Sequence, residues 1–401
     1  MISNLSKVIA CLGMPVSMLA TATPAEAATS NSTPVAYIYI ANTPHPSRTT
    51  YSPHQIVAYA ADDQGKLTPL PGSPFKHDLG PMAVNGLYLI GVKGNQQIIN
   101  TYKIASDGHL DYVAETHYAE HNDHSCGAAG QVFFDHTGRS LYVQEYNIDC
   151  ANSGTASYAV DIETGTLSWL GDTVTGAEYN DVNPASFIAD NIYAFAAGPG
   201  GCYYYESDAF ERNNDGLLTE LTGGGATNYP EPAPSFRRYV PYLVAADTTN
   251  HVAITETPAN PPDCLNRPVQ LATYTADAYG NLTTASTYEN MPETAIFNPY
   301  DLKMAPSGRL VAIAGQEGLE IFHFNGASPI TAFTGLLTRD PINQMFWDND
   351  NHLYAISQAA NKLHVFTVTN TSYREAAGSP YSVTSPDNII VQPWPLPWVK
   401  K

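Results

Sequence analysis

The densest group of side chains that could do chemistry is His117-x-x-Glu120-His121-x-x-His124. Three imidazoles and a carboxylate are ligands that a divalent cation such as Zn²⁺ accepts. The spacing differs from the helical H-E-x-x-H pattern of zinc enzymes, and Asn122-Asp123 between the last two histidines favours a loop. We therefore interpret the group as a solvated polar loop and expect neither a metal ion nor another cofactor.

A second polar stretch, residues 43–54, contains His45, Arg48 and His54. An ordinary long loop accounts for its composition, so it carries no specific chemistry at this level. A glycine-rich phosphate loop and a nucleophile elbow are both missing from the sequence. The one glycine run, residues 223–225, is not followed by a helical pattern and simply ends a turn.

The N-terminus is typical of an exported protein. A short head with one lysine precedes an apolar run, Val8–Ala20, which is too short to span a bilayer, and Ala25-Glu26-Ala27 is a small-x-small cleavage site. We predict a signal peptide over residues 1–27 and one mature domain over residues 28–401, secreted or periplasmic. No later stretch is apolar enough to anchor the chain, so we expect no membrane insertion.

Export gives meaning to the cysteines that follow the leader: Cys126, Cys150, Cys202 and Cys264. An even set in an oxidising compartment predicts two disulfides, for which three pairings are open. Neither a C-x-x-C motif nor a zinc spacing of Cys and His is present, so structural zinc is not expected.

The chain is acidic, with 18 basic and 38 acidic residues and a formal net charge of −20. Such a surface repels phosphate backbones and anionic lipids, which argues against nucleic acid as a partner. Only 14% of the residues are charged, whereas Gly, Pro and Tyr are abundant. This composition favours short strands joined by turns over long surface helices.

One pattern recurs along the chain: an aromatic-rich strand, a polar turn that usually contains Gly, and a second short strand. Clear copies are Val57–Leu67, Thr101–Leu110, Tyr158–Leu167, Tyr204–Leu217 and Tyr274–Leu282, with weaker ones at Phe322–Gly326 and Val365–Thr367. Another hairpin lies between copies, clearest at Val132–Val143, Leu302–Ala312 and Met345–Ala355. Four strands per unit and about 53 residues per unit predict an all-β fold, a seven-bladed β-propeller with four antiparallel strands per blade.

The two ends of the chain fit one shared blade. Ala36–Ile40 resembles a second strand, and Asn388–Val391 resembles a first strand. The C-terminal strand is therefore predicted to complete the N-terminal blade, which removes the open seam of the ring.

The strand placement also bears on the cysteines. It puts Cys126 and Cys150 in loops of blade 3, and Cys202 and Cys264 in the inner loops of blades 4 and 5, all on one face. It favours the pairs Cys126–Cys150 and Cys202–Cys264, with a structural rather than a redox role.

A resemblance follows from two motifs. The hairpin F-D-x-x-G-R-x-L-Y-V at residues 134–143 and the turn D-x-x-G-x-L-T-x-L-x-G-S-P-F at residues 62–75 resemble the lactonase-type propellers. That group contains the propeller 6-phosphogluconolactonases, the carboxymuconate cyclases and many exported relatives. The resemblance covers nearly all of residues 34–395 and implies ring-opening or lactonising chemistry on the loop-rich channel face.

The resemblance implies a His, a Glu and Arg residues as the catalytic set. Glu256, at the end of Val252–Glu256, matches the Glu position. Arg237 and Arg238 lie near the companion Arg position, about two residues out of register. The His position is Gly130 here, and His124, six residues upstream, could substitute only if the loop carries an insertion.

The same carry-over indicates three substrate-binding positions. Glu145 keeps an acidic residue at the end of a blade 3 strand, and Asp301 matches an acidic position before the Leu302 strand. A later Arg position of the family is Gln316. Because the family pattern is kept at some of these positions and replaced at others, the sequence leaves the reaction open.

Two functions from different classes therefore remain. The first is an exported lactonase-like enzyme, without a required cofactor, that hydrolyses or forms a sugar lactone or another cyclic ester. The second is a noncatalytic propeller that acts as a binding or envelope-associated module. In both cases we expect a monomer with a small carbohydrate or lactone ligand on the channel face.

Overall fold

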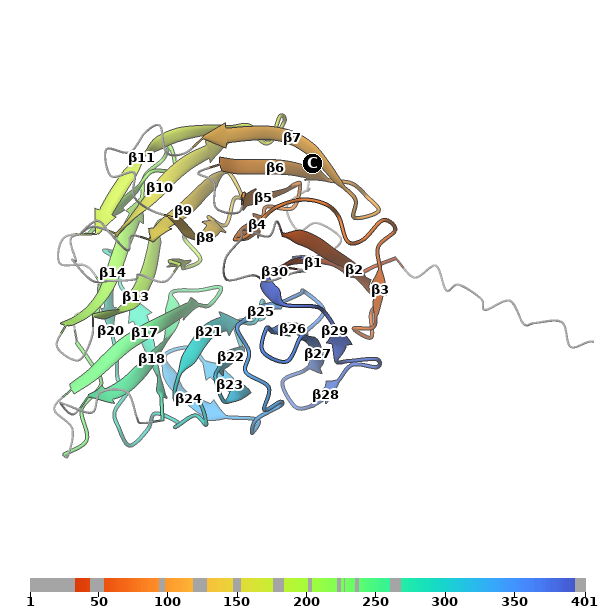
Figure 1. Cartoon of the computed structure of the whole chain (residues 1–401). Helices are drawn as coiled ribbons and strands as arrows, with labels where there is room; N and C mark the ends of the chain where they lie inside the picture. The colour runs from red at the N-terminus through yellow and green to blue at the C-terminus, as the bar shows by residue number, and fades with distance from the viewer. Residues whose placement is uncertain are drawn as a thin grey trace, which may run out of the picture. The chain divides into compact units, whose positions relative to one another are not determined.

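The structure is a computed structural model that describes residues 33–43, 54–93, 98–117, 128–146, 153–175, 184–200, 204–221, 225–226, 228–234, 238–259 and 268–393. These residues belong to one compact unit, Thr33–Lys401. They form seven sheets of four or five strands arranged in a ring, as Figure 1 shows, and the strands pair antiparallel except for one parallel pair in the fifth sheet. The predicted seven-bladed propeller is confirmed. Within these ranges no helix has the length and hydropathy needed to cross a bilayer.

The blades follow one another along the chain, each running from an inner to an outer strand. Blade 1 consists of β30 (Pro386–Pro393), β1 (Ala36–Asn42), β2 (Gln55–Ala61) and β3 (Leu67–Pro69). Blade 2 consists of β4 (Met82–Val84), β5 (Tyr88–Val92), β6 (Ile98–Ile104) and β7 (Leu110–His117). Blade 3 consists of β8 (Ala128–Phe134), β9 (Ser140–Tyr146), β10 (Ser153–Val160) and β11 (Leu167–Thr175). Blade 4 consists of β12 (Ser186–Phe187), β13 (Tyr193–Gly200), β14 (Tyr204–Arg212) and β15 (Leu218–Glu220).

The last three blades repeat this plan, two of them with an added strand. Blade 5 consists of β17 (Arg238–Ala246), β18 (His251–Ala259), β19 (Gln270–Ala276), β20 (Asn281–Thr283) and, outermost, β16 (Gly225–Ala226). Blade 6 consists of β21 (Pro299–Met304), β22 (Leu310–Gly315), β23 (Gly318–Asn325) and β24 (Ser328–Ala332). Blade 7 consists of β25 (Gln344–Trp347), β26 (His352–Ser357), β27 (Lys362–Val368) and β28 (Tyr373–Glu375), with β29 (Tyr381–Ser382) also paired to β27.

The two ends of the folded unit meet in blade 1. Strand β30 pairs with β1 from Ala36↔Pro393 to Asn42↔Pro386, so the last strand of the chain is the innermost strand of the first blade. This is the predicted closure. It leaves no unpaired strand at the junction between the two ends of the ring.

The hydrophobic core is divided into wedges between blades. The buried apolar side chains of the described residues form seven clusters, and each cluster joins one blade to the next. Side chains alternate along a strand between its two faces, so each strand contributes to two neighbouring wedges. Ile38 and Tyr39 illustrate this: Ile38 packs towards blade 7 and Tyr39 towards blade 2.

Tyrosines connect neighbouring blades by hydrogen bonds. Tyr39 in blade 1 donates to the carbonyl of Gly108, in a blade 2 turn, at 2.8 Å, and Tyr142 in blade 3 donates to Gly216, in a blade 4 turn, at 2.8 Å. Two further interfaces have the same contact, from Tyr88 to Glu163 at 3.1 Å and from Tyr193 to Ala278 at 3.3 Å. The glycine-containing turns between the third and fourth strands of blades 2 to 5 are therefore docking points for a tyrosine of the preceding blade.

Glycine is required in these turns for two reasons. Gly108 has φ of 83°, a conformation in which a side chain is strained. A methyl group at Gly108 would also lie 2.7 Å from Cδ1 of Tyr37, well inside van der Waals contact. Gly335 lies in an open position, where a methyl group would meet nothing within 4 Å.

Replacement of Gly108 by Ala should therefore lower the free energy of unfolding by about 2–4 kcal/mol, combining the backbone strain and the clash with Tyr37. The matched change Gly335→Ala should shift it by no more than about 0.5–1 kcal/mol. Urea unfolding followed by tyrosine fluorescence measures both. Equal effects of the two changes would contradict the docking role of the turn.

Candidate functional site

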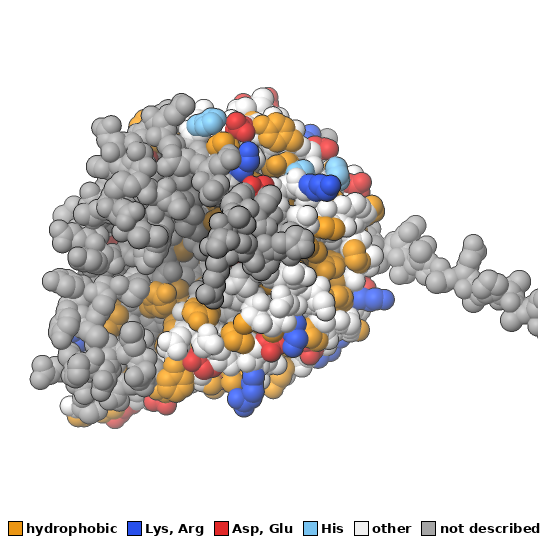
Figure 2. Space-filling view, viewed as in Figure 1, with side chains coloured by type: hydrophobic (Ala, Val, Ile, Leu, Met, Phe, Trp, Pro, Cys, Tyr) orange, Lys and Arg blue, Asp and Glu red, His pale blue; other side chains and the backbone are white. Residues whose placement is uncertain are grey.

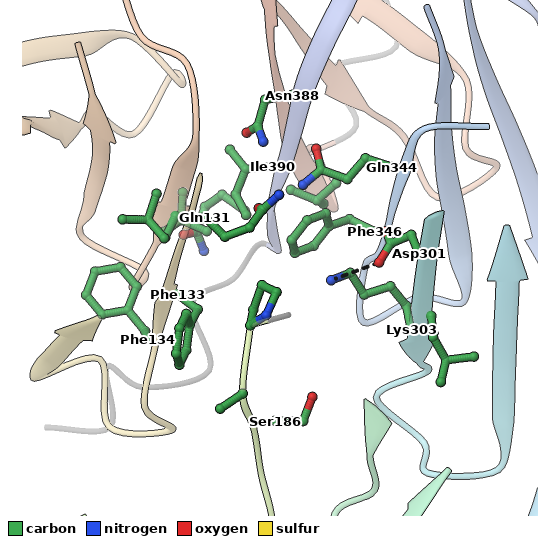
Figure 3. A pocket seen from close by; sticks show the side chains of 18 of the residues that line it. Gln131, Phe133, Phe134, Ser186, Asp301, Lys303, Gln344, Phe346, Asn388 and Ile390 are labelled. Atoms are coloured by element: carbon green, nitrogen blue, oxygen red, sulfur yellow. Dashed lines mark ion pairs between the residues drawn. The ribbon is translucent and has the colours of Figure 1, made fainter. Parts of the chain in front are cut away.

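The central channel contains a cavity of about 490 Å³. The innermost strand of every blade contributes to its wall: β4, β8, β12, β17, β21, β25 and β30. Figure 3 shows side chains from these strands converging on the cavity, among them Phe133, Phe346, Asp301, Lys303 and Gln344. A cavity of this size accommodates a small molecule, and its wall mixes aromatic rings with polar groups.

An ion pair lies on one side of the cavity. Asp301 and Lys303, two residues apart on β21, place Oδ1 and Nζ 3.3 Å from each other. The Lys303 ammonium also lies 5.0 Å from the centroid of the Phe346 ring, a cation–π distance. The pair is neutral as a whole, and 31% of the Lys303 side chain is exposed, so its ammonium is accessible to a ligand.

Polar side chains on the inner strands also connect successive blades. Oδ2 of Asp301 accepts the backbone N–H of Met345 at 2.9 Å, and Oε1 of Gln344 accepts that of Ile389 at 2.7 Å. Oδ1 of Asn388 accepts the N–H of Met82 at 3.2 Å. We call these three hydrogen bonds the inner latches; they join blades 6 to 7, 7 to 1 and 1 to 2.

The inner latches fix the orientation of two amides in the cavity wall. A backbone N–H can only donate, so the amide oxygens of Gln344 and Asn388 must face it. The NH₂ groups of these two amides bond to no other residue in the described part of the chain. Both residues line the cavity, which therefore offers two amide donors.

A histidine bridges two carboxylates at the entrance to β30. His54 Nδ1 lies 3.3 Å from Oδ1 of Asp78, and its Nε2 lies 3.4 Å from Oδ2 of Asp387. The hydrogen bond with Asp387 is the largest of the effects that raise the pKa of His54, while partial burial opposes them. Asp387 belongs to the cavity wall, and His54 and Asp78 lie behind it.

Glu256 occupies a different environment. It is fully buried on β18, and the hydroxyl of Tyr274 donates to its Oε1 at 2.7 Å. Oε2 has no hydrogen-bond partner among the described residues, and Glu256 is not part of the cavity wall. Burial raises the pKa of Glu256 to about 8, only partly offset by the Tyr274 hydrogen bond. Burial in the wedge between blades 4 and 5, beside Tyr274, thus favours the neutral form of the Glu256 carboxyl.

Of the other three predicted catalytic residues, only Arg238 lies in the part of the chain that the structure describes. Arg238 begins β17, is half-buried and pairs with Ala259, whereas Glu256 pairs with Pro241. Arg238 is three residues away from Pro241, the residue opposite Glu256, and three residues of a strand span about 10 Å. Arg237 and His124 lie outside the described residues, so the convergence of this set stays a prediction.

The predicted substrate-binding residues divide in the same way. Asp301 lines the cavity, and exposed Gln316 accepts a hydrogen bond at 2.7 Å from Tyr300, another residue of the cavity wall. Glu145 lies on β9 opposite Gly154, and its side chain is outside the described part of the structure. The four cysteines of the predicted disulfides, Cys126, Cys150, Cys202 and Cys264, are also outside it.

Sequence reasoning missed Lys303, Gln344, Asn388 and Asp387. A signal for two of them was present, because a polar residue stands directly before the apolar run in Gln344-Met345 and Asn388-Ile389, as it does in Asp301-Leu302. The structure shows that this recurring position is that of the inner latches.

Solved structures share this fold at low sequence identity. A periplasmic gluconolactonase of Pseudomonas aeruginosa is 14% identical, with a TM-score of 0.62, over 89% of this chain and 98% of that one. A Lactobacillus plantarum protein is 12% identical, with a TM-score of 0.62, over 89% and 99%. A candidate 6-phosphogluconolactonase of Bacteroides fragilis is 13% identical, with a TM-score of 0.59, over 89% and 97%.

These similarities establish the fold alone, a β-propeller of the kind found in these solved structures. Neither a protein-family model nor a curated protein matches the chain by sequence. The fold by itself does not assign a reaction, because propellers host unrelated functions.

The buried acid makes stability depend on pH. Because the pKa of Glu256 is raised from 4.5 to about 8, the folded state holds a proton that the unfolded chain releases in this interval. The contribution of the Glu256 proton to the free energy of unfolding is complete below pH 4.5. It is lost as pH rises towards 8, by up to about 1.4 kcal/mol per pH unit.

Denaturant unfolding at a series of pH values from 5 to 8 measures this loss. Glu256→Gln keeps a neutral side chain that can accept the Tyr274 hydrogen bond, and should flatten the dependence. Glu163→Gln, at an exposed turn, is the control and should leave the slope as it is in the unchanged protein. A slope unaffected by Glu256→Gln would show that Glu256 is ionised in the folded protein.

Proposed function

We propose that this chain is an exported, lactonase-like propeller that binds a small carbohydrate or lactone in its channel cavity and opens or forms a cyclic ester there. The observation that supports this most directly is the cavity wall. It brings an accessible ammonium, two oriented amide donors and carboxylates together from several blades. The fold shared with a periplasmic gluconolactonase of Pseudomonas aeruginosa is consistent with it.

The cavity groups fit the needs of lactone hydrolysis. Water attacks the acyl carbon and forms a new C–O bond, while the ring C–O bond breaks and the ring oxygen takes up a proton. Asp301 would accept the proton of the attacking water. Lys303, 3.3 Å from Asp301, would hold the negative charge that develops on the carbonyl oxygen.

The set inferred from family resemblance is a separate proposal for the same reaction. Glu256, Arg237, Arg238 and His124 would act together on the loop-rich face. Glu256 is buried and outside the cavity wall, so this set requires a binding site distinct from the channel cavity. Single substitutions distinguish the two proposals, because each set predicts a different residue to be indispensable.

Lys303→Met should lower kcat/KM for a hydrolysed lactone by about a hundredfold, since it removes the cation that stabilises the oxyanion. Glu256→Gln should keep kcat/KM within about threefold, because Glu256 does not reach the cavity. A pH-stat assay of residues 28–401 with sugar, phosphosugar and aromatic lactones measures turnover. Lys103→Met, at an exposed position, is the matched control.

Loss of turnover in Glu256→Gln, with Lys303→Met fully active, would move the chemistry to the loop-rich face. No turnover of any lactone by the unchanged protein would contradict the enzymatic proposal.

A noncatalytic binding module is the second candidate function. The observation that favours it is the burial of Glu256, the best-matched catalytic position of the family, as a neutral acid without exposure. In this case the cavity would bind a small carbohydrate and release it unchanged. Binding of a small carbohydrate in calorimetry, without turnover of any lactone, would support this second function.

Export is part of the proposal, and the N-terminus and disulfides of the mature protein test it directly. When the gene product is made with its leader in an exporting host, the mature N-terminus should be Ala28. A non-reducing peptide map of the denatured protein should contain Cys126–Cys150 and Cys202–Cys264, because disulfides persist in oxidising compartments. Recovery of a chain that starts at Met1, with all five cysteines as reactive thiols, would contradict export.

A further inference from the structure

A β-bulge places Asp387 in the cavity wall. Along the pairing of β1 with β30, Ala41 faces Asn388 and Asn42 faces Pro386, so Asp387 is the extra residue without a partner. Bulges of this kind re-aim a side chain and are enriched next to binding sites. Here the redirected side chain is a carboxylate, 44% exposed, that lines the cavity.

Register shifts also occur in three other inner strands, β8, β17 and β21. In β21 and β8, as in β30, a single residue is skipped: Tyr300 and Gly130 respectively. The residue after the skipped one is polar in these strands: Asn388 in β30, Asp301 in β21 and Gln131 in β8. Tyr300 also lines the cavity, so this position in the blade repeat projects towards the channel. Gly130 is the position at which the family resemblance implies a catalytic His. In this chain the equivalent position of blade 1 holds a charged residue, Asp387.

Asp387 is held in place from behind. His54 Nε2 contacts its Oδ2, and the opposite nitrogen of the same ring contacts Asp78. Asp78 also accepts the backbone N–H of His54 at 2.8 Å, which fixes the start of β2 against the loop that carries Asp78. Oδ1 of Asp387 has no partner among the described residues and is the oxygen available to a ligand.

The arrangement does not suit one metal ion. Nδ1 and Nε2 point to opposite sides of the imidazole ring, so Asp78 and Asp387 cannot share a cation with His54. No group of three metal-ligating side chains is found among the residues that the structure describes.

The charges of the cavity wall favour a neutral ligand. The three charged residues in the wall are Asp301, Lys303 and Asp387, and Asp301 neutralises Lys303. Asp387 is left as a carboxylate acceptor in the same wall as the amide donors of Gln344 and Asn388. Aromatic rings such as Phe346 supply an apolar surface. Hydroxyl groups that both donate and accept, on a ring with an apolar face, complement this set.

Charges elsewhere do not offset this preference. Figure 2 shows Lys and Arg interspersed with Asp and Glu over the described surface in that view, and the chain as a whole carries a net charge of −20. A phosphorylated ligand would therefore meet a negative carboxylate in the cavity of a negative protein.

We propose that Asp387, positioned by His54 and Asp78, accepts hydrogen bonds from ligand hydroxyls and makes the cavity selective for an uncharged polyhydroxylated ring over its phosphorylated form. This inference rests on the proposed function, because it assigns the substrate class of the same cavity. Asp387 is the specificity-determining residue, and His54 is a positioning residue that acts through it.

The test uses two stable, ring-shaped analogues of sugar lactones: D-glucono-1,5-lactam and its 6-phosphate. Isothermal titration calorimetry on the mature chain, residues 28–401, should give at least about tenfold tighter binding of the neutral lactam. Asp387→Asn should weaken lactam binding about tenfold, because it replaces a charged acceptor. It should also improve binding of the phosphate relative to the lactam, so that the preference for the lactam falls to about threefold or less.

Two further variants separate positioning from general effects. His54→Gln, which keeps a donor towards Asp387, should retain the preference for the lactam better than His54→Ala. Asp111→Asn removes the same charge at an exposed site of β7 and should leave both affinities unchanged. Circular dichroism of each variant shows whether the fold is kept.

The outcomes are distinct. Binding of the lactam together with equal or tighter binding of its phosphate would overturn the assigned specificity and leave the proposed function standing. Preference for the lactam that persists in Asp387→Asn would remove Asp387 from its role. Binding of neither analogue to the unchanged protein would overturn this inference and the sugar-binding function together.

Discussion

The hydrogen bond from a tyrosine of one blade to a turn of the next holds neighbouring blades in place at four successive interfaces, from blade 1 to blade 5. Each blade is a small sheet that cannot bury both faces alone, so its stability comes from the wedges shared with its neighbours. The hydrogen bonds from Tyr39 and Tyr142 to the carbonyls of Gly108 and Gly216 fix how far one blade is displaced against the next. Because the ring must close after seven blades, small errors in this displacement would add up at the junction of β30 with β1.

The inner latches perform a related task at the channel. They join the innermost strands across three successive interfaces, and the residues that make them also form the cavity wall. The orientation of the polar groups in the cavity wall and the cohesion of the ring therefore depend on the same side chains. A site built on paired strands in this way is more rigid than one built on loops.

The fold could be predicted from the sequence because its signals are local and repeated. Each glycine-containing turn and each aromatic strand can be recognised within about a dozen residues. The closure could be predicted because residues 36–40 resemble the second strand of a blade and residues 388–391 resemble a first strand. The cavity could be predicted only in part. Asp301 was expected at the site, whereas Lys303 and Gln344 were not, because the cavity joins single residues from seven segments that are far apart in sequence.

Glu256 shows the complementary difficulty. Its position in the blade repeat is visible in the sequence, but its burial depends on side chains such as Tyr274 that pack around it. The charge state of a carboxyl is decided by this environment and not by its neighbours in sequence. The place of Asp387 in the cavity wall could not be predicted for a similar reason. A single skipped residue in the pairing of β1 with β30 determines where its side chain points.

The closure by β30 has a consequence for the order in which the cavity forms. Asp387 and Asn388 follow the residues of the other six blades in sequence, yet they line the cavity that all seven blades surround. The wall is therefore incomplete until β30 pairs with β1, and the first blade has its full set of strands only at that step. Pairing of the two ends of the ring and completion of the cavity are thus one event in folding.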